Sequence, residues 1–168
     1  MTAKSSIDLS GWEAGLAKLQ GPLRVSLARS MGVAGGKVLR DEAKRWAPNG
    51  EKSGSKTPGL LEQSIYLAFK DGKSTSTKLT YGVSWNGKTA PHGHLVEFGH
   101  WMTHQVIQKA DGTWITLKDQ PLPSPKWVEA KPFLRPAYHV AKGQAKDAMI
   151  ERGRQRLPEL LAGAADEP

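Results

Sequence analysis

The sequence predicts an α+β domain, in which N-terminal helices and a C-terminal helix pack on a small antiparallel sheet. Three observations predict this fold class. Apolar residues recur at helical spacing before Pro48 and again after Phe133. Between these segments, short runs alternate apolar and less apolar residues, and turn residues separate the runs. The 168 residues suit a single domain over residues 1–168, with residues 1–9 and 162–168 expected to be flexible.

Two helices are predicted in the first third of the chain. Ser10 and Glu13 have the spacing of a capping box, which marks the start of the first helix. Gly21-Pro22 indicates a break, because proline is favoured in the first turn of a new helix, and Pro48 ends that second helix. The apolar residues that support the two helices are Trp12, Leu16, Leu19, Leu23, Leu27, Met31, Val38, Leu39 and Trp46.

Three glycines interrupt the second helix. Gly32, Gly35 and Gly36 each weaken it by about 1 kcal/mol relative to alanine. We therefore expect packing to hold this helix, and we expect the small residues to let another backbone approach closely. The same stretch resembles a phosphate-binding loop only in composition, because no strand precedes it.

A first hairpin is predicted from two runs with strand periodicity. Residues 65–69 and 79–85 alternate as strands, and residues 71–74 supply the turn between them. Residues 89–99 follow, and we expect them to form a short helical turn. Its apolar side chains are expected to point inward, namely Leu95, Val96 and Phe98.

A second hairpin is predicted further along. Its strands are residues 105–109 and 113–117, joined by a turn at Ala110-Asp111-Gly112. Residues 119–126 contain three prolines, so we expect this stretch to be extended and stiff. The last helix is expected to start near Phe133 and to stop at Pro158.

Composition limits the classes of protein. The chain has no cysteine, which excludes disulfides, thiolate nucleophiles and cysteine-based zinc sites. The first residues lack the apolar core of a signal peptide, and no run approaches the roughly 20 apolar residues that span a bilayer. We therefore expect a soluble intracellular product with no membrane partner.

The formal net charge of +8 favours contact with nucleic acid, or alternatively serves solubility and assembly. The longest basic cluster, residues 152–156, is short and is interpreted as the last turn of a helix.

The sequence offers no catalytic residues and no cofactor site. No Gly-x-Ser-x-Gly motif occurs, and no pair of acidic residues has the spacing of a general acid and base. Four histidines, His92, His94, His100 and His104, lie close together with Glu97 among them, but their spacing matches no known metalloenzyme pattern. We therefore predict no metal site, although a metal-dependent enzyme built on these histidines remains a third hypothesis.

The six tryptophans divide into two groups. The first group, Trp12, Trp46 and Trp85, lies at apolar positions of predicted elements and is assigned to the core. The second group lies in or beside the second hairpin and the proline-rich stretch, where a small monomer has little means of burying it. Large aromatic side chains are favoured at protein interfaces, so we predict a docking arm that uses Trp101, Trp114 and Trp127.

Three separated segments then carry a family resemblance. The first is Ala47-Pro48 followed, after a polar gap, by residues 57–65 (TPGLLEQSI). The second is residues 94–99 (HLVEFG), and the third is residues 131–137 (KPFLRPA). In this order and spacing they resemble the tail-completion or head–tail joining (neck) proteins of tailed phages, a group similar to minor tail protein Z. The resemblance covers about residues 20 to 150, and its motif residues include Glu97, Phe98, Gly99, Pro132, Phe133, Leu134, Arg135 and Pro136.

The resemblance implies a structural protein of the virion and not an enzyme. Such subunits assemble as a ring, which the symmetry of the tail suggests is a hexamer, at the neck or the end of the tail. The implied partners are other copies of the chain, neighbouring head-connector and tail proteins, and the DNA that passes through the channel. The chain would belong to a phage or a prophage, and it would be made in the host bacterial cytoplasm before it joins the virion.

Two departures from the family pattern stand out. Pro58 interrupts the usual Thr-Gly step, and some thirty residues separate Gly99 from the third motif. This stretch, residues 100–130, is interpreted as an inserted hairpin arm. Within the motifs, we expect Arg135 to pair with Glu97 and so to hold the last helix against the central turn. The alternative function is a sequence-nonspecific nucleic-acid-binding protein that uses the positive charge without any assembly.

Overall fold

The computed structural model describes residues 21–50, 58–75, 77–110 and 114–165, with side chains described up to residue 162. The predicted first helix with its Ser10–Glu13 capping box therefore lies outside the described residues, as does Trp12. Most of the predicted turn at residues 110–112 also lies outside them. The described elements are α2 (Gly21–Trp46), α3 (Leu60–Ser64), β1 (Ile65–Phe69), the 3₁₀ turn η3 (Asp71–Lys73), β2 (Tyr81–Trp85), α4 (Gly93–Phe98), β3 (His100–Gln108), β4 (Trp114–Val128) and α5 (Leu134–Ala165).

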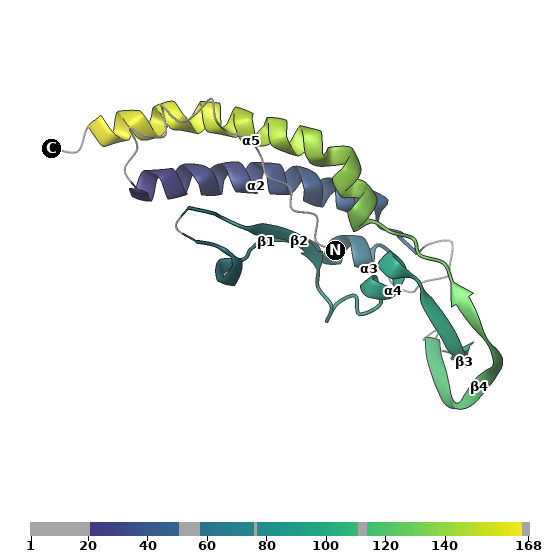
Figure 1. Cartoon of the computed structure of the whole chain (residues 1–168). Coiled ribbons are helices and arrows are strands. Elements are labelled where there is room, and N and C mark those ends of the chain that lie inside the picture. The colour runs from purple at the N-terminus through teal and green to yellow at the C-terminus, as the bar shows by residue number, and fades with distance from the viewer. Residues whose placement is uncertain (1–20, 51–57, 76, 111–113, 166–168) are drawn as a thin grey trace. The chain divides into compact units, whose positions relative to one another are not determined.

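These elements confirm the α+β class (Figure 1). The strands form two separate two-stranded sheets, β1 with β2 and β3 with β4. The first sheet is antiparallel, because the Lys70 amide bonds the Thr80 carbonyl at one end while the Asn86 amide bonds the Ser64 carbonyl at the other. The second sheet is also antiparallel and is the predicted hairpin arm.

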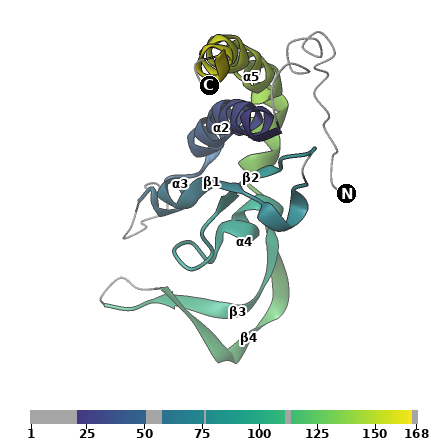
Figure 2. The ribbon, with the colours of Figure 1, turned by 90° about the vertical axis from the view of Figure 1, so that its left-hand side faces the viewer.

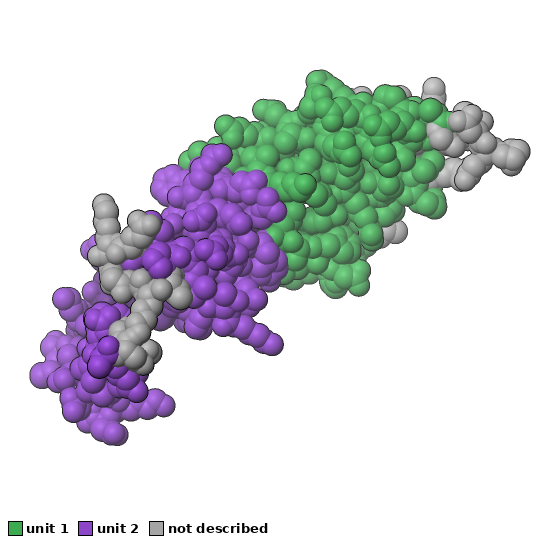
Figure 3. Space-filling view, turned by 180° about the vertical axis from the view of Figure 1, so that it is seen from behind, with its two compact units in different colours: residues 1–39, 67–82, 140–168 green, residues 40–66, 83–139 purple. Residues whose placement is uncertain are grey.

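The chain divides into two compact units (Figure 3). Unit 1 comprises residues 1–39, 67–82 and 140–168, and unit 2 comprises residues 40–66 and 83–139. Both units use parts of α2, α5 and the β1–β2 sheet. The organisation of the chain as one domain stays a prediction.

Unit 1 is built on two antiparallel helices, α2 and α5, which lie side by side in both ribbon views (Figures 1 and 2). Its core consists of Leu27, Met31 and Leu160, with further leucines and Met149 packed against them. A Cβ placed on Gly35 would lie 2.9 Å from the Ala145 carbonyl oxygen. The close approach of another backbone is therefore confirmed at Gly35, whereas a Cβ on Gly32 or Gly36 would meet the side chains of Tyr81 and Leu67. These contacts explain how a glycine-weakened helix is held.

The end predicted for the last helix is wrong. Pro158 lies inside α5, which continues to Ala165. A proline inside a helix costs about 3 kcal/mol, because it lacks an N–H and its ring crowds the preceding turn. Leu157, Leu160 and Leu161 flank Pro158 and belong to the unit 1 core, so burial of apolar surface offsets this cost. The basic cluster at residues 152–156 is consequently in the helix body and not in its last turn.

Unit 2 has its own core around Phe133, which is fully buried. The Trp85 ring meets the Phe133 ring edge-on at 5.8 Å, so the prediction that Trp85 belongs to the core is confirmed. The other core residues come from the end of α2, from α3 and β1, from the turn before α4 and from the start of α5; they are Ala43, Ala47, Leu61, Ile65, Ala90 and Ala137.

Two aromatic residues assigned to the interior are exposed instead. Trp46 is 46% exposed, because the buried positions at this end of α2 are Ala43 and Ala47, and the indole N–H donates to the Glu42 carboxylate at 2.9 Å. Phe98 is 61% exposed. The side chain that α4 buries is the neighbouring Glu97, and this exchange defines the site described next.

Candidate functional site

A buried carboxylate lies at the start of the last helix. Glu97 is 1% exposed, and its Oε2 accepts hydrogen bonds from the backbone amides of Phe133 at 2.7 Å and Leu134 at 3.0 Å. Its Oε1 accepts a further bond from the Arg135 amide at 3.3 Å. The first amides of a helix have no partner within the helix, and they favour a negative charge. Glu97 therefore acts as an N-cap of α5, supplied from a different element.

The predicted pair between Arg135 and Glu97 is confirmed. The Arg135 Nε donates to Glu97 Oε1 at 3.1 Å, and its Nη2 donates to the Glu97 backbone carbonyl at 2.7 Å. The guanidinium lies 5.3 Å from the centroid of the Phe98 ring. Phe98 points outward because its ring covers the face of this cation, an arrangement that is favourable at a partly exposed site.

The same motifs enclose the base of the hairpin arm. Gly99 has a φ of 74°, and a Cβ placed on it would lie 2.8 Å from the Val128 carbonyl oxygen and 3.0 Å from the Ala130 amide nitrogen. A side chain at residue 99 would therefore be strained and would collide with the returning strand. The Lys131 amide also bonds the Val96 carbonyl at 2.8 Å. The two ends of the arm thus meet beside the Glu97 cap.

The arm itself is longer than predicted. β3 begins at His100, and β4 runs through the whole proline-rich stretch, which is extended as expected. Trp101 lies opposite Trp127, and Gln108 lies opposite Trp114. The register shifts twice between Met102 and Val106, so β4 bulges where its prolines occur.

The three predicted interface tryptophans lie on this arm and are exposed. The exposed fractions are 60% for Trp101, 55% for Trp114 and 45% for Trp127. The Trp101 and Trp127 rings meet edge-on at 5.3 Å, next to a shallow hollow of about 490 Å³ lined by Trp101, Thr103 and Pro125. Other exposed apolar residues of the arm are Val106, Ile107 and Val128. The arm therefore concentrates apolar surface in a way that is typical of interaction sites.

The histidines form no metal site among the described residues, where no group of three or more histidine, aspartate or glutamate side chains could hold an ion. The His104 Nδ1 lies 2.9 Å from the Thr103 hydroxyl. The His100 Nδ1 is buried and has no hydrogen-bond partner in the described part of the chain. Glu97 is committed to α5 and to Arg135, so the acidic residue of the histidine cluster has a structural role.

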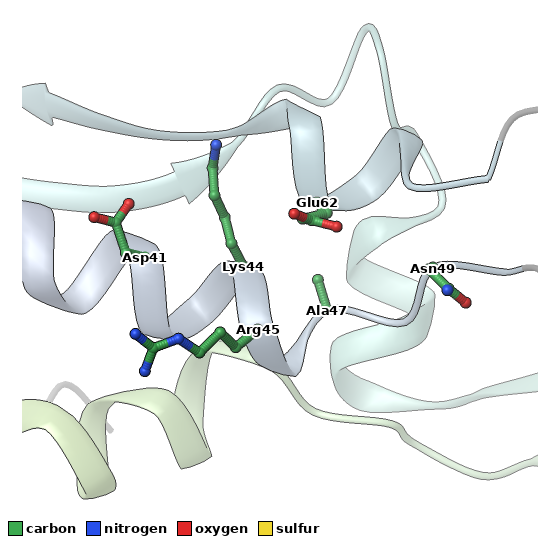
Figure 4. A pocket seen from close by; sticks show the side chains of 6 residues that line it. All are labelled: Asp41, Lys44, Arg45, Ala47, Asn49 and Glu62. Carbon is green, nitrogen blue, oxygen red and sulfur yellow. The ribbon is translucent and has the colours of Figure 1, made fainter.

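A second hollow, of about 580 Å³, lies in unit 2 and is lined by Asp41, Lys44, Arg45, Ala47, Asn49 and Glu62 (Figure 4). Charges of both signs line it. Arg45 also pairs with Glu42 at 2.6 Å, and Arg40 pairs with Asp41 at 2.7 Å. This mixture of charges does not define a site for a ligand of one sign.

The N-cap role of Glu97 was not predicted from the sequence. The sequence indicated the ion pair with Arg135 but not the three backbone amides. The available signal was an acidic residue within an apolar run, Val96-Glu97-Phe98, because a buried carboxylate needs several donors.

Among the described residues, no helix is long and apolar enough to cross a membrane.

Comparison with known proteins gives one family. No curated protein and no solved structure matches the chain significantly. A family model described as "Bacteriophage HK97-gp10, putative tail-component" matches residues 13–99, which is more than half of the chain. The arm and the third motif, residues 131–137, lie beyond the matched residues. The chain belongs to the HK97-gp10-like family of phage tail components, whose role in the particle is structural.

Proposed function

We propose that this tail component assembles as a closed ring at the neck or the tail end of the particle, that its subunits join through the β3–β4 arm, and that DNA passes through the ring. The observation that carries the proposal is the exposed, tryptophan-bearing arm on a chain whose family is structural. A hexamer matches the symmetry expected of a tail.

The arm has the properties of an unfinished interface. An isolated two-stranded hairpin is marginally stable in water, so an arm of this length gains stability when another surface packs on it. Tryptophan side chains contribute strongly to interfaces when they are desolvated. Trp101 and Trp127 already support each other through their edge-on contact, so they present an organised apolar surface.

The base of the arm is held firmly, which suits a contact of defined geometry. Glu97 binds the start of α5 on one side of the arm, and Gly99 lies against Val128 on the other. An arm that docks on a different patch of the next subunit makes a heterologous contact. Contacts of this kind generate a ring when the rotation between subunits closes.

The charge distribution supports contact with DNA. In unit 1, the described acidic residues are Asp71, Asp147, Glu151 and Glu159, and Glu159 is paired with Arg156. Lysine and arginine outnumber them there, at Arg24, Arg29, Lys37, Lys70, Lys73, Lys78, Lys142, Lys146, Arg152, Arg154 and Arg156. Binding through such charges is independent of sequence and weakens as salt rises.

The second candidate function rests on this charge alone. A sequence-nonspecific nucleic-acid-binding protein would bind duplex DNA as an isolated monomer and would not need the arm. Its Kd for duplex DNA would be lower than the roughly 10⁻⁴–10⁻⁶ M that is typical of nonspecific binding at physiological salt.

Removal of the arm separates the two candidates. Because the Gly99 and Ala130 backbones are adjacent, residues 100–130 can be replaced by a short glycine linker without pulling α4 away from α5. The proposal expects a ring-sized species for the full chain and a monomer for the deleted chain, both measured by light scattering. A full chain that stays monomeric and binds duplex DNA with a steep salt dependence would support the second candidate and contradict the first.

A further inference from the structure

The two strands of the arm differ in how their outer edges are protected. β3 and β4 pair with each other, so each has one edge directed away from the hairpin, and no other strand among the described residues pairs with either edge. An open edge exposes amide and carbonyl groups that can pair with another chain. Natural proteins protect such edges with proline, charged residues and bulges.

β4 carries all of these protections. Its prolines, Pro121, Pro123 and Pro125, stand at alternate positions and remove three amide donors. It also carries Lys118, Asp119 and Lys126, and the register shifts of the hairpin produce a bulge on its side.

β3 carries none of them. Its nine residues, HWMTHQVIQ, contain no proline, no glycine and no lysine, arginine, aspartate or glutamate. The strand continues without interruption along the arm, and Thr103 and Gln105 are exposed. The edge of β3 is therefore the side of the arm on which a further strand can add.

The order of side chains in β3 points to a second copy of β3 as that strand. In an antiparallel pair of identical strands, one residue at the centre faces its own copy. A pair centred on His104 places Trp101 opposite Ile107, Met102 opposite Val106, and Thr103 opposite Gln105. Apolar residues then face apolar residues, polar residues face polar ones, and an aromatic faces a β-branched side chain, which is a favourable cross-strand combination.

Neighbouring registers lose this match. A pair centred on Thr103 places Trp101 opposite Gln105, and a pair centred on Gln105 places Thr103 opposite Ile107. Centring on His104 also covers two exposed side chains with each other, since Trp101 is 60% exposed and Ile107 is 43% exposed.

We propose that two copies of the chain pair through residues 101–107 at the outer edges of their β3 strands, antiparallel and centred on His104, to form a four-stranded sheet in the order β4-β3-β3-β4. Such a sheet has more strands than an isolated hairpin, which favours its stability. The contact is twofold and closed, so it forms a dimer. It differs from the ring contact, which joins two different patches, and it does not depend on the proposed ring.

A single cysteine tests the register directly, because the chain has no cysteine of its own. Residues directly opposite each other in an antiparallel pair have Cα atoms about 4.5–5.5 Å apart, which is within the range of a disulfide. His104→Cys should therefore oxidise to a disulfide-linked dimer at least about tenfold faster than the control Ser124→Cys, which places the thiol on the protected strand. A mixture of Thr103→Cys and Gln105→Cys chains should cross-link faster than either chain alone. Equal rates for His104→Cys and Ser124→Cys would overturn the proposal, and fastest cross-linking of Thr103→Cys alone would overturn the register.

A charge exchange at the same two exposed positions provides an independent test. Thr103→Lys with Gln105→Lys places like charges opposite each other and should weaken dimerisation at least about tenfold in sedimentation equilibrium. Thr103→Lys with Gln105→Glu places opposite charges there and should keep the dimer. If both double variants dimerise like the parent chain, the β3 edge is not the contact. If the ring still forms in the Thr103→Lys/Gln105→Lys variant, the proposed function remains intact. If the parent chain forms the dimer but no ring, only the edge contact remains.

Discussion

The Glu97 cap and the β3–β4 arm are adjacent in the sequence, but they differ in whether the chain itself supplies contacts for their side chains. The Glu97 carboxylate is buried and receives four hydrogen bonds, all from residues 133–135 of the same chain. The arm leaves its tryptophans exposed, and no third strand among the described residues pairs with β3 or β4. The cap is therefore completed by the fold, whereas the proposed function completes the arm with another molecule. Mutations in the two regions should affect different measurements.

The largest expected effect on stability is at the cap. Glu97→Ala removes the acceptor of three helix amides and leaves Arg135 without its carboxylate. We expect a loss on the order of 3 kcal/mol in the free energy of unfolding, because buried donors lose their partners. Thermal or denaturant unfolding measures this loss, and Glu62→Ala, at an exposed site, serves as the control with little change. A loss as small as that of the control would show that the Glu97 cap does not stabilise unit 2.

Gly99→Ala should have the next largest effect. The substitution forces an alanine into a positive φ and toward the Val128 carbonyl, so we expect about 1–3 kcal/mol of destabilisation. Gly87→Ala is the matched control, because a Cβ there meets nothing within 4 Å. The comparison uses denaturant midpoints of the full chain. Equal midpoints for the two variants would contradict the close approach of β4 at the base of the arm.

Arg135→Ala should have a smaller effect than either. The Arg135 side chain is 57% exposed, so solvent screens its pair with Glu97, and we expect a loss of about 1 kcal/mol. Arg135→Lys should recover only part of it, because an ammonium group cannot bond the carboxylate and the Glu97 carbonyl in the same fork geometry. Thermal unfolding of the parent chain, Arg135→Ala and Arg135→Lys measures this order of stability. If Arg135→Ala changed neither stability nor assembly, the pair would have no role.

Substitutions of the arm tryptophans should change stability least. Trp101→Ser removes a ring that is 60% exposed and meets the Trp127 ring, and Trp114→Ser removes a ring that is 55% exposed, so we expect a change within about 0.5 kcal/mol for each. The same variants should reduce assembly. Circular dichroism during thermal unfolding measures the first effect. A large loss of stability would show that the arm belongs to the fold, and the contrast with Glu97 would disappear.

The sequence predicted the elements whose bounds depend on residues that are close together in the chain. Gly21-Pro22 and Pro48 bounded α2 because proline acts on its own helix turn, and period-two alternation located β1 and β2. Pro158 and Trp46 were assigned wrongly because distant packing decided them: leucines of α5 and α2 hold the helix past Pro158, and Ala43 and Ala47 take the buried positions beside Trp46.

Within the site, the motif order brought Glu97 and Arg135 together, since each side chain needed a partner of opposite charge. The bonds from Glu97 to the helix amides could not be predicted, because they depend on where the start of α5 lies relative to α4. Phe98 was misplaced for the same reason: its neighbour takes the buried position, and its ring covers the Arg135 cation.

The most direct test of subunit contact through the arm is the mass in solution of the parent chain and of two matched triple variants, measured by light scattering. Trp101→Ser/Trp114→Ser/Trp127→Ser removes the exposed aromatics of the arm, and Trp46→Ser/Tyr66→Ser/Val140→Ser removes three similarly exposed apolar side chains elsewhere. We predict a ring-sized mass for the parent chain and the second variant, and a much smaller mass for the first. Loss of assembly in the second variant, with assembly retained in the first, would contradict the assignment of subunit contact to the arm.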